Sequence, residues 1–178
     1  MGTMKPPRPL PPEVETLCEK LQAQPKLLRH LQVVHDVATD LVEGLHRLFP
    51  KLVFDGDAVL FGAATHDLGK VLRNNELTGA GSNHEVDGPI VLQKAGVSPE
   101  LSRFAGTHGT WNGDLPLEDL LVALADALWK GRLPQLEDIV ARKIAAMLGV
   151  QEWEVFFFVD ELANELSADG QERLAWCR

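Results

Sequence analysis

Residues 61–72, FGAATHDLGKVL, combine an apolar run with an adjacent His66–Asp67 pair and Lys70. Burying a carboxylate is costly unless it is paired or bound to a metal ion. An apolar segment that ends in an imidazole and a carboxylate therefore indicates chemistry rather than plain packing. Residues that could join the pair stand on both sides of it: His30 or His35 upstream, and His84, His108 and Asp126 downstream. We predict a metal centre of histidine and aspartate side chains.

The ligand types limit which ions such a centre could hold. Imidazole and carboxylate together suit divalent ions, and we expect one or two ions of Mn, Fe, Co, Ni, Zn or Mg. The two cysteines, Cys18 and Cys177, stand near opposite ends of the chain. They form no CxxC pair, which excludes a structural zinc site of the thiolate type. We expect both to be reduced structural thiols.

Helices must position these residues. Apolar residues recur at spacings of three and four along most of the chain, and no segment alternates in the way of a strand. We predict an all-α protein, a single helical bundle of about seven to nine helices. The predicted helices cover residues 12–21, 25–49, 58–65, 83–95, 99–108, 116–129, 134–148 and 151–168, with a last turn in 171–178.

Helical geometry ranks the two upstream histidines. The apolar stripe of their helix ends at Leu48, before Pro50. At 100° per residue, His30 lies about 50° from the centre of this stripe, and His35 lies about 90° away on the other side. His30 is therefore the first choice as an inward-facing ligand, and His35 is the second.

Capping residues and a glycine predict where the helices next to the His66–Asp67 pair begin and end. Asp57 is expected to cap the third predicted helix, and Gly69 is expected to adopt the left-handed backbone that closes it. Ser82 or Asn83 is expected to cap the helix that carries His84.

Two later helices contain notable side chains. The helix over 116–129 is apolar around Asp126, so this carboxylate needs a partner, and a structural salt bridge is the alternative to a metal ion. The last long helix contains an aromatic cluster, which we expect to pack in the core: Trp153, Phe156, Phe157 and Phe158.

The length of 178 residues predicts one domain. Residues 1–12 contain five prolines, which exclude a regular helix there, and we expect a flexible Pro-rich tail. Residues 13–178 are expected to form the domain. The site residues fall within about 25–132, and the helices of 134–178 pack on this part.

Charge and hydropathy exclude several kinds of partner. The formal net charge is −9 and the pI is about 5.1, so the chain is a poor ligand for nucleic-acid polymers and acidic membranes. No apolar run approaches the roughly 20 residues that span a membrane. Residues 1–12 lack the apolar core of a signal peptide, so we expect a cytoplasmic protein. Nothing in the pattern indicates an oligomeric state.

The order His30, His66–Asp67, Asp126 resembles the H…HD…D signature of the HD-domain superfamily of metal-dependent phosphohydrolases. RHLQVVHDVA (29–38) is similar to the family's first motif, and THDLGK (65–70) to its HDIGK form. SNHEVDGPIVLQKAGV (82–97) is similar to its GHE-type helix, AGTHGTW (105–111) to the segment with a further histidine, and ALADALW (123–129) to its final AD motif. The resemblance covers about residues 25–132.

The resemblance implies a site and an activity. One metal ion would be held by four ligands: His30, His66, Asp67 and Asp126. A second ion would be held by His84 and His108, with Asp67 bridging the two. The implied reaction is hydrolysis of a phosphoester, with a phosphorylated, nucleotide-like small molecule as substrate.

Two residues are the implied catalytic groups. Asp67 could orient the attacking water in addition to binding metal, and Lys70 is the candidate for a phosphate contact. Weaker candidates for that contact are Arg103, Lys130 and Arg132.

Two substrate signatures of the superfamily are missing. LGKV (68–71) stands where guanosine-polyphosphate hydrolases carry a Glu-Asp pair. The Gly-Tyr-Pro signature of cyclic-dinucleotide phosphodiesterases is absent, because the chain contains no tyrosine. Neither substrate is expected.

Two other functions are open. Some HD-domain proteins with four histidines and two aspartates are di-iron oxygenases that cleave C–C or C–P bonds, and THDLGKVL (65–72) is similar to the corresponding stretch of the inositol oxygenases. The second alternative is a non-catalytic metal-binding or sensing module, whose acidic helices would bind a partner.

Overall fold

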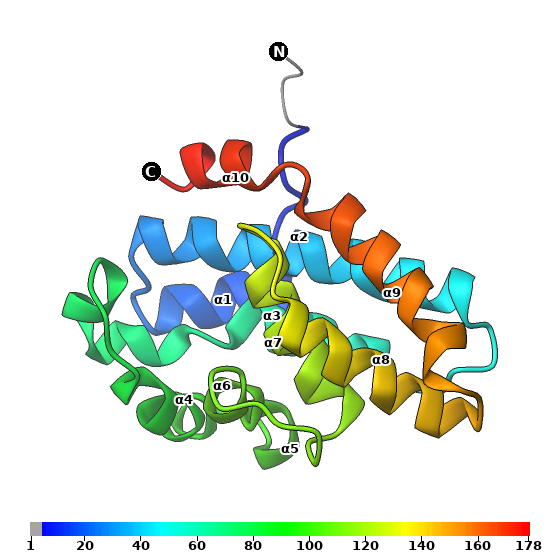
Figure 1. The fold of residues 1–178 in the computed structure, drawn as a ribbon. Helices are drawn as coiled ribbons and strands as arrows, with labels where there is room; N and C mark the ends of the chain where they lie inside the picture. Colours follow the sequence, from blue (N-terminus) through cyan, green and yellow to red (C-terminus); the bar gives the residue numbers. More distant parts are fainter. Residues whose placement is uncertain (1–4) are drawn as a thin grey trace.

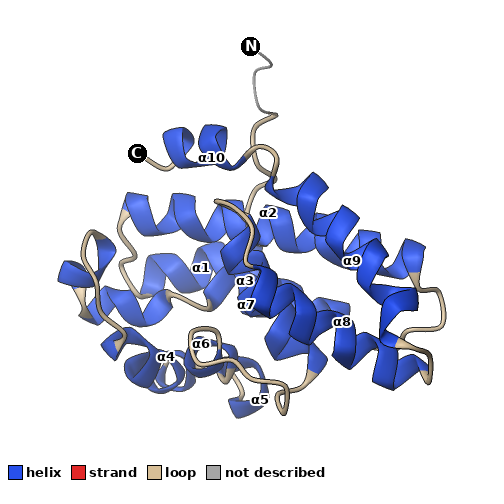
Figure 2. Ribbon diagram, viewed as in Figure 1, coloured by secondary structure: helices blue, strands red, loops and turns tan. Residues whose placement is uncertain are grey.

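The computed structural model describes residues 5–178. Within this range the chain consists of helices and loops and contains no strand (Figure 2), which confirms the all-α prediction. Eight helices, α1–α4 and α7–α10, have seven residues or more, in agreement with the expected seven to nine.

The long helices are α1 (Pro12–Lys20), α2 (Pro25–Leu48), α3 (Gly56–Thr65), α4 (Asn83–Lys94), α7 (Leu117–Leu128), α8 (Pro134–Leu148), α9 (Glu152–Ser167) and α10 (Gly170–Trp176). Four short elements complete the fold: the 3₁₀ helices η1 (Leu68–Leu72) and η2 (Asn74–Leu77), and the single turns α5 (Pro99–Ser102) and α6 (Phe104–Thr107).

The main core lies between α2, α3, α7, α8 and α9 (Figure 1). The stripe of α2 at spacings of three and four is buried, including Val34, Ala38 and Leu41. α3 and α7 are apolar on nearly every side, so both are enclosed by other helices. These three helices therefore form a fixed frame through the middle of the molecule.

A smaller core fills the space between α1, the first turns of α2, η1 and α4. Val14 and Leu17 of α1 meet Leu27 and Leu31 of α2 there, and Leu68 of η1 is fully buried. This second core supports η1 directly after the His66–Asp67 pair.

Among residues 5–178, no helix combines the length and the apolarity that crossing a membrane requires.

The Pro-rich segment expected at 1–12 lies partly outside the described residues, which begin at residue 5. Residues 5–11 form no helix, but the Arg8 guanidinium pairs with Asp36 and with Asp40 of α2, each at 2.6 Å. Leu10 is buried in the smaller core. Contacts with α2 thus fix part of the segment that composition alone marks as a tail.

The start of α3 differs from the expected cap. The helix begins at Gly56, and Asp55 Oδ1 accepts the N–H of Ala58 at 2.9 Å. Asp57 lies in the first turn, where its charge faces the positive end of the helix dipole instead of capping it. The turn around residue 55 therefore starts the helix two residues earlier than the sequence predicts.

The aromatic cluster of α9 is exposed, so the prediction that it packs in the core was wrong. The buried face of α9 is formed by Val155, Val159, Leu162, Ala163 and Leu166. Trp153 and Phe157 do not belong to this buried face and are 75 % and 58 % exposed. The helix has two apolar faces, and the aliphatic one is turned to the core.

Candidate metal centre

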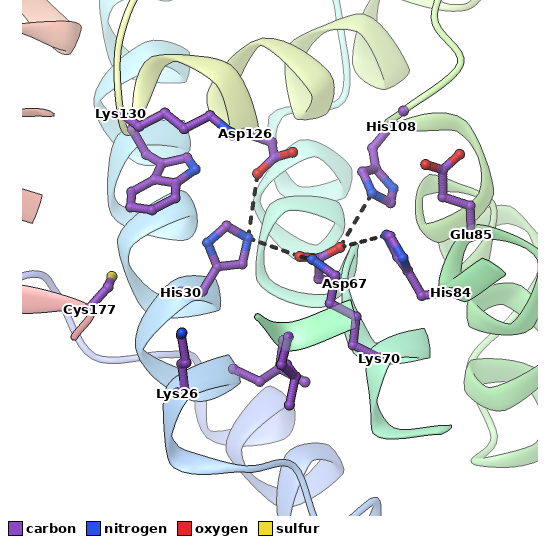
Figure 3. A pocket seen from close by; sticks show the side chains of 14 residues that line it. Lys26, His30, Asp67, Lys70, His84, Glu85, His108, Asp126, Lys130 and Cys177 are labelled. Atoms are coloured by element: carbon purple, nitrogen blue, oxygen red, sulfur yellow. Dashed lines mark hydrogen bonds and ion pairs between the residues drawn. The ribbon is translucent and has the colours of Figure 1, made fainter. Parts of the chain in front are cut away.

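The structure brings all six predicted ligands together in the middle of the bundle, and Figure 3 shows five of them around the cavity. Their overlapping sets have donor atoms within 4.8 Å of one another: His30–His66–Asp67, His66–His108–Asp126 and Asp67–His84–His108. They come from α2, the end of α3, the first turn of α4, the residue after α6, and α7. A site assembled from so many segments depends on the tertiary fold.

Asp67 lies at the centre and faces a different set with each oxygen. Its Oδ2 lies 3.0 Å from His30 Nε2 and 3.7 Å from His66 Nε2. Its Oδ1 lies 3.1 Å from His84 Nε2 and 3.4 Å from His108 Nε2. The carboxylate is 3 % exposed and stands between two pairs of histidines. It is therefore placed as a bridge between two ligand sets.

Asp126 completes the first set. Its Oδ1 lies 3.4 Å from His30 Nε2 and 3.3 Å from His66 Nε2. The two imidazole nitrogens lie 3.3 Å from each other. The partners of this carboxylate are therefore the two histidines of the cluster, with which it can form ion pairs or share a bound metal ion.

Hydrogen bonds on the far side of two of the rings, those of His66 and His108, orient these histidines. His66 Nδ1 lies 2.8 Å from the carbonyl oxygen of Ala63, and His108 Nδ1 lies 3.2 Å from that of Phe104. A carbonyl oxygen can only accept, so each Nδ1 carries the proton. The Nε2 lone pair of each ring is then free to bind an ion in the cluster.

The donor atoms fit a divalent ion. Ligands at about 2.0–2.2 Å from one ion are about 3.0–3.5 Å apart in octahedral or tetrahedral arrangements. The contacts of His30 Nε2 with Asp67, His66 and Asp126 are 3.0, 3.3 and 3.4 Å. His66 Nε2 also faces the carboxylate oxygens of Asp67 and Asp126, at 3.7 and 3.3 Å. The chemistry and the spacing of this set therefore suit a cation.

The pKa values of the clustered histidines and of Asp67 also indicate that positive charge is favoured in the cluster. Burial lowers the pKa of His30, but its hydrogen bonds to Asp126 and Asp67 outweigh burial and raise the pKa to about 9. The pKa values of His84 and His108 are also raised, since contact with Asp67 outweighs burial. Burial raises the pKa of Asp67, but the surrounding histidines outweigh it and hold the value well below the usual range.

Glu76 is a site residue that the sequence did not reveal. It is buried in η2, and its Oε2 accepts the Nδ1–H of His84 at 2.6 Å and the backbone N–H of His84 at 3.1 Å. Its Oε1 accepts the backbone N–H of Asn83 at 3.3 Å. One carboxylate thus caps α4, in place of the expected Ser82 or Asn83 side chain, and turns His84 Nε2 toward Asp67.

Gly69 allows η1 and α4 to touch through their backbones. It does not adopt the left-handed conformation expected for it; the glycines with positive φ in the described chain are Gly96 and Gly149. A Cβ on Gly69 would lie 2.1 Å from the carbonyl oxygen of His84. Glycine is needed there for close approach, and this approach brings His84 to Asp67.

His35 lies outside the cluster. It is buried on another side of α2, and burial lowers its pKa. Its Nδ1 has no hydrogen-bond partner among the described residues. Of the two candidates, the structure thus places His30, the first choice, beside Asp67.

A cavity of about 350 Å³ opens onto the cluster. Lys70 lies in it with its ammonium 2.5 Å from Asp67 Oδ2. Lys26 and Lys130 also line it, on the side of His30 (Figure 3), and Glu85 lies on the opposite side, beside His108. The lining thus combines three lysines with three carboxylates, those of Asp67, Glu85 and Asp126.

The weaker phosphate candidates divide between this cavity and other contacts. Lys130 lines the cavity. Arg103 pairs instead with Asp119 at 3.0 Å, and Arg132 pairs with Asp160 at 2.6 Å. Lys26 was not singled out from the sequence, because it precedes the apolar stripe of α2 and looks like an ordinary exposed lysine.

Comparison of the chain with protein-family models, with curated proteins and with solved structures gives no match in any of the three. The arrangement of the donor atoms is therefore the observation that supports a metal centre. Above all, one oxygen of Asp67 faces His30 and the other faces His84.

Proposed function

We propose that the protein is a metal-dependent phosphohydrolase that cleaves a phosphoester in a small, nucleotide-like molecule. The observation that carries this proposal is the position of Asp67, whose two oxygens face His30 and His84. Two ligand sets that share a carboxylate suit a pair of ions acting on one phosphoryl group. The ligand order, which resembles that of the HD-domain superfamily, supports the same activity.

Bound divalent ions would supply Lewis acidity to the attacking water, the phosphoryl oxygens and the leaving group. The protein must hold its ligands still and bind the substrate. Asp67 can accept a hydrogen bond from the attacking water and so orient it. Lys70, beside Asp67, carries a positive charge that can pair with a phosphate oxygen.

The cavity sets limits on the substrate. Its volume of about 350 Å³ suits a small molecule rather than a polymer. Trp129 forms part of the wall, and Lys130 lies 5.8 Å from its ring. Lys26 and Lys130 can hold an anionic group of the substrate beside the ligand cluster. The Trp129 ring offers the substrate an apolar surface.

Metal analysis joined to an activity assay tests the proposal. The wild type is expected to bind near two equivalents of a divalent ion and to hydrolyse a chromogenic phosphoester. His84→Ala should retain near one equivalent, and Asp67→Ala less than one, with turnover reduced by a factor of about 10² or more. His46→Ala is the matched control, because this histidine is exposed and stacks on Phe54 away from the cluster.

Other results would change the assignment. One equivalent in the wild type, unchanged in His84→Ala, would replace the two-ion site by a mononuclear phosphohydrolase. Iron with a visible absorption band that responds to oxygen would favour the di-iron oxygenase. Bound metal without turnover of phosphomonoesters, phosphodiesters or nucleotides would favour a non-catalytic module.

A further inference from the structure

The exposed aromatic face of α9 is the largest feature that the metal centre does not explain. Trp153, Phe156 and Phe157 lie at spacings of three and four, and they are 75 %, 47 % and 58 % exposed. Phe158 is 42 % exposed, and its ring lies 5.8 Å from that of Phe157. Large contiguous apolar patches are uncommon on monomeric proteins and mark interaction surfaces.

The face is shaped to receive another helix. A shallow hollow lies along α9, lined by Gln151, Glu152, Trp153, Phe156, Phe157 and Asp160. Because all of its lining comes from one helix and the residue before it, the hollow is a groove between side chains of a single surface. The occupant that fits such a groove is an elongated element with protruding side chains, such as a helix.

Charge argues against a strongly basic partner. The two acidic residues that line the groove are already paired within the chain. Glu152 lies 3.5 Å from Arg142, and Asp160 lies 2.6 Å from Arg132. The groove is therefore close to neutral, although the whole chain has a net charge of −9. An aromatic, nearly neutral surface of the same kind is a suitable occupant.

The exposed aromatic side chains can supply the apolar centre of a dimer interface. With about 200 Å² for each large aromatic side chain, the exposed fractions of Trp153, Phe156 and Phe157 leave roughly 350 Å² in water. Phe158, whose ring lies 5.8 Å from that of Phe157, raises this to roughly 430 Å². A stable interface of ordinary size buries about 800 Å² per partner, so these side chains supply about half of one.

An antiparallel pairing brings the phenyl rings together. In such a pair of helices centred between Phe156 and Phe157, each Phe156 ring faces Phe157 of the other helix, and Trp153 faces Asp160 of the other helix. Every contact then occurs twice, as a two-fold interface requires. We propose that this face of α9 is the interface of a symmetric dimer, in which α9 packs antiparallel on α9 of a second copy of the chain.

Sedimentation of the full chain at several concentrations tests the dimer. The wild type is expected to show twice the chain mass of 19.6 kDa and to dissociate on dilution. Trp153→Glu and Phe157→Glu should sediment as monomers with unchanged helical circular dichroism. Val53→Glu, at an apolar residue that is 84 % exposed in the connector between α2 and α3, is the matched control and should remain dimeric.

Cross-linking tests the antiparallel arrangement. Phe157→Cys lies next to the proposed two-fold axis, so mild oxidation should join two chains. Glu165→Cys is exposed on the same helix, and its two copies would be about 25 Å apart along the helices, too far for a disulfide. The native Cys18 and Cys177 are buried and serve as the background in both variants.

Three results would overturn the proposal. The first is a wild type that stays monomeric at concentrations on the order of 100 μM, where even weak dimers form. The second is a dimer that Trp153→Glu and Phe157→Glu do not dissociate, which would place the interface elsewhere. The third is a monomer that binds phosphatidylcholine vesicles through Trp153, with its fluorescence shifted to the blue, which would assign the face to a lipid surface.

Discussion

The metal centre and the aromatic face of α9 depart from the usual distribution of residues in opposite ways. In the centre, charged and polar side chains are buried: Asp67 is 3 % exposed and His66 is fully buried. On α9, large aromatic side chains lie in water, with Trp153 exposed to 75 %. Ordinary packing explains neither arrangement, because burial of charge and exposure of aromatic surface both cost free energy.

The two regions differ in the kind of partner that would lower the free-energy cost of each arrangement. The side chains of the centre are largely buried, and its histidine rings are oriented by Ala63, Phe104 and Glu76, so we expect its partner to be a small cation at a fixed point. The α9 face is open and close to neutral, so its partner must be large and apolar. Variants of one region should therefore leave the other unchanged.

The largest effect on the centre is expected from Gly69→Ala. The new Cβ would lie 2.1 Å from the carbonyl oxygen of His84, so η1 and α4 must separate. We expect a loss of about 3 kcal/mol in the free energy of unfolding, the upper end for overpacking, measured by chemical denaturation. Gly131→Ala is the control, because a Cβ there meets no atom within 4 Å. Equal stability of the two variants would contradict the close backbone contact.

Glu76→Ala should affect one half of the centre. Removing this carboxylate leaves the His84 ring and two backbone N–H groups of α4 without their acceptor, at a cost of about 1–3 kcal/mol. Affinity for the ion held by His84 and His108 should fall about 10–100-fold, with the other site unchanged. Calorimetric metal titration measures both steps. Glu172→Ala, at an exposed residue of α10, is the control, and an equal fall at both sites would refute a role limited to His84.

The metal-free protein should lose stability as the pH rises above neutrality. The pKa of His30 is raised to about 9, from about 6.5 for an unfolded histidine. The stabilisation is therefore complete below pH 6.5 and is lost as the pH rises through about 9. The melting temperature should fall by about 2–4 °C for each kcal/mol lost. Saturating divalent ion should remove this slope, and a flat profile without metal would contradict the charge balance of the cluster.

Low pH should also lower the stability of the metal-free protein, through protonation of the carboxylates instead of deprotonation of the histidines. The pKa values of Asp67 and Asp126 are lowered in the folded protein, so their stabilisation is present above the ordinary carboxyl pKa and is lost as the pH falls through the folded values. The metal-free protein should therefore be most stable between about pH 4 and 6.5.

The smallest effect on the folded chain is expected from Trp153→Glu. A substitution at a side chain that is 75 % exposed should change the free energy of unfolding of the monomer by no more than about 0.5 kcal/mol. The melting temperature of the wild type should rise with protein concentration, and that of the variant should not. Metal content should be the same in both, and a lower content in the variant would show that the two regions are coupled.

The sequence predicted the fold class and indicated the six candidate ligands for a physical reason. A period of three and four shows where a helix has an apolar face, and His30 stands close to that of α2. His66 and Asp67 directly follow an apolar helix, and Asp126 interrupts another. Buried polar residues in apolar surroundings are visible in a one-dimensional pattern.

The remaining features depend on packing between segments and were not visible. Glu76 stands in a polar stretch, and only the 3₁₀ turn of η2 places its carboxylate at the start of α4. Gly69 is needed because a neighbouring backbone touches it, not because of its own dihedral angles. α9 carries two apolar faces, and periodicity alone does not decide which of them is turned to the core.

The contact between Gly69 and His84 has an evolutionary consequence. Position 69 can change only if the backbone of α4 moves away, and that movement would separate His84 from Asp67. In descendants of a common ancestor, glycine at 69 and histidine at 84 should therefore be kept or lost together. Gly113 and Gly131, where a side chain would meet nothing, are free to drift. A backbone contact without any side chain thus leaves a trace in the pattern of inherited variation.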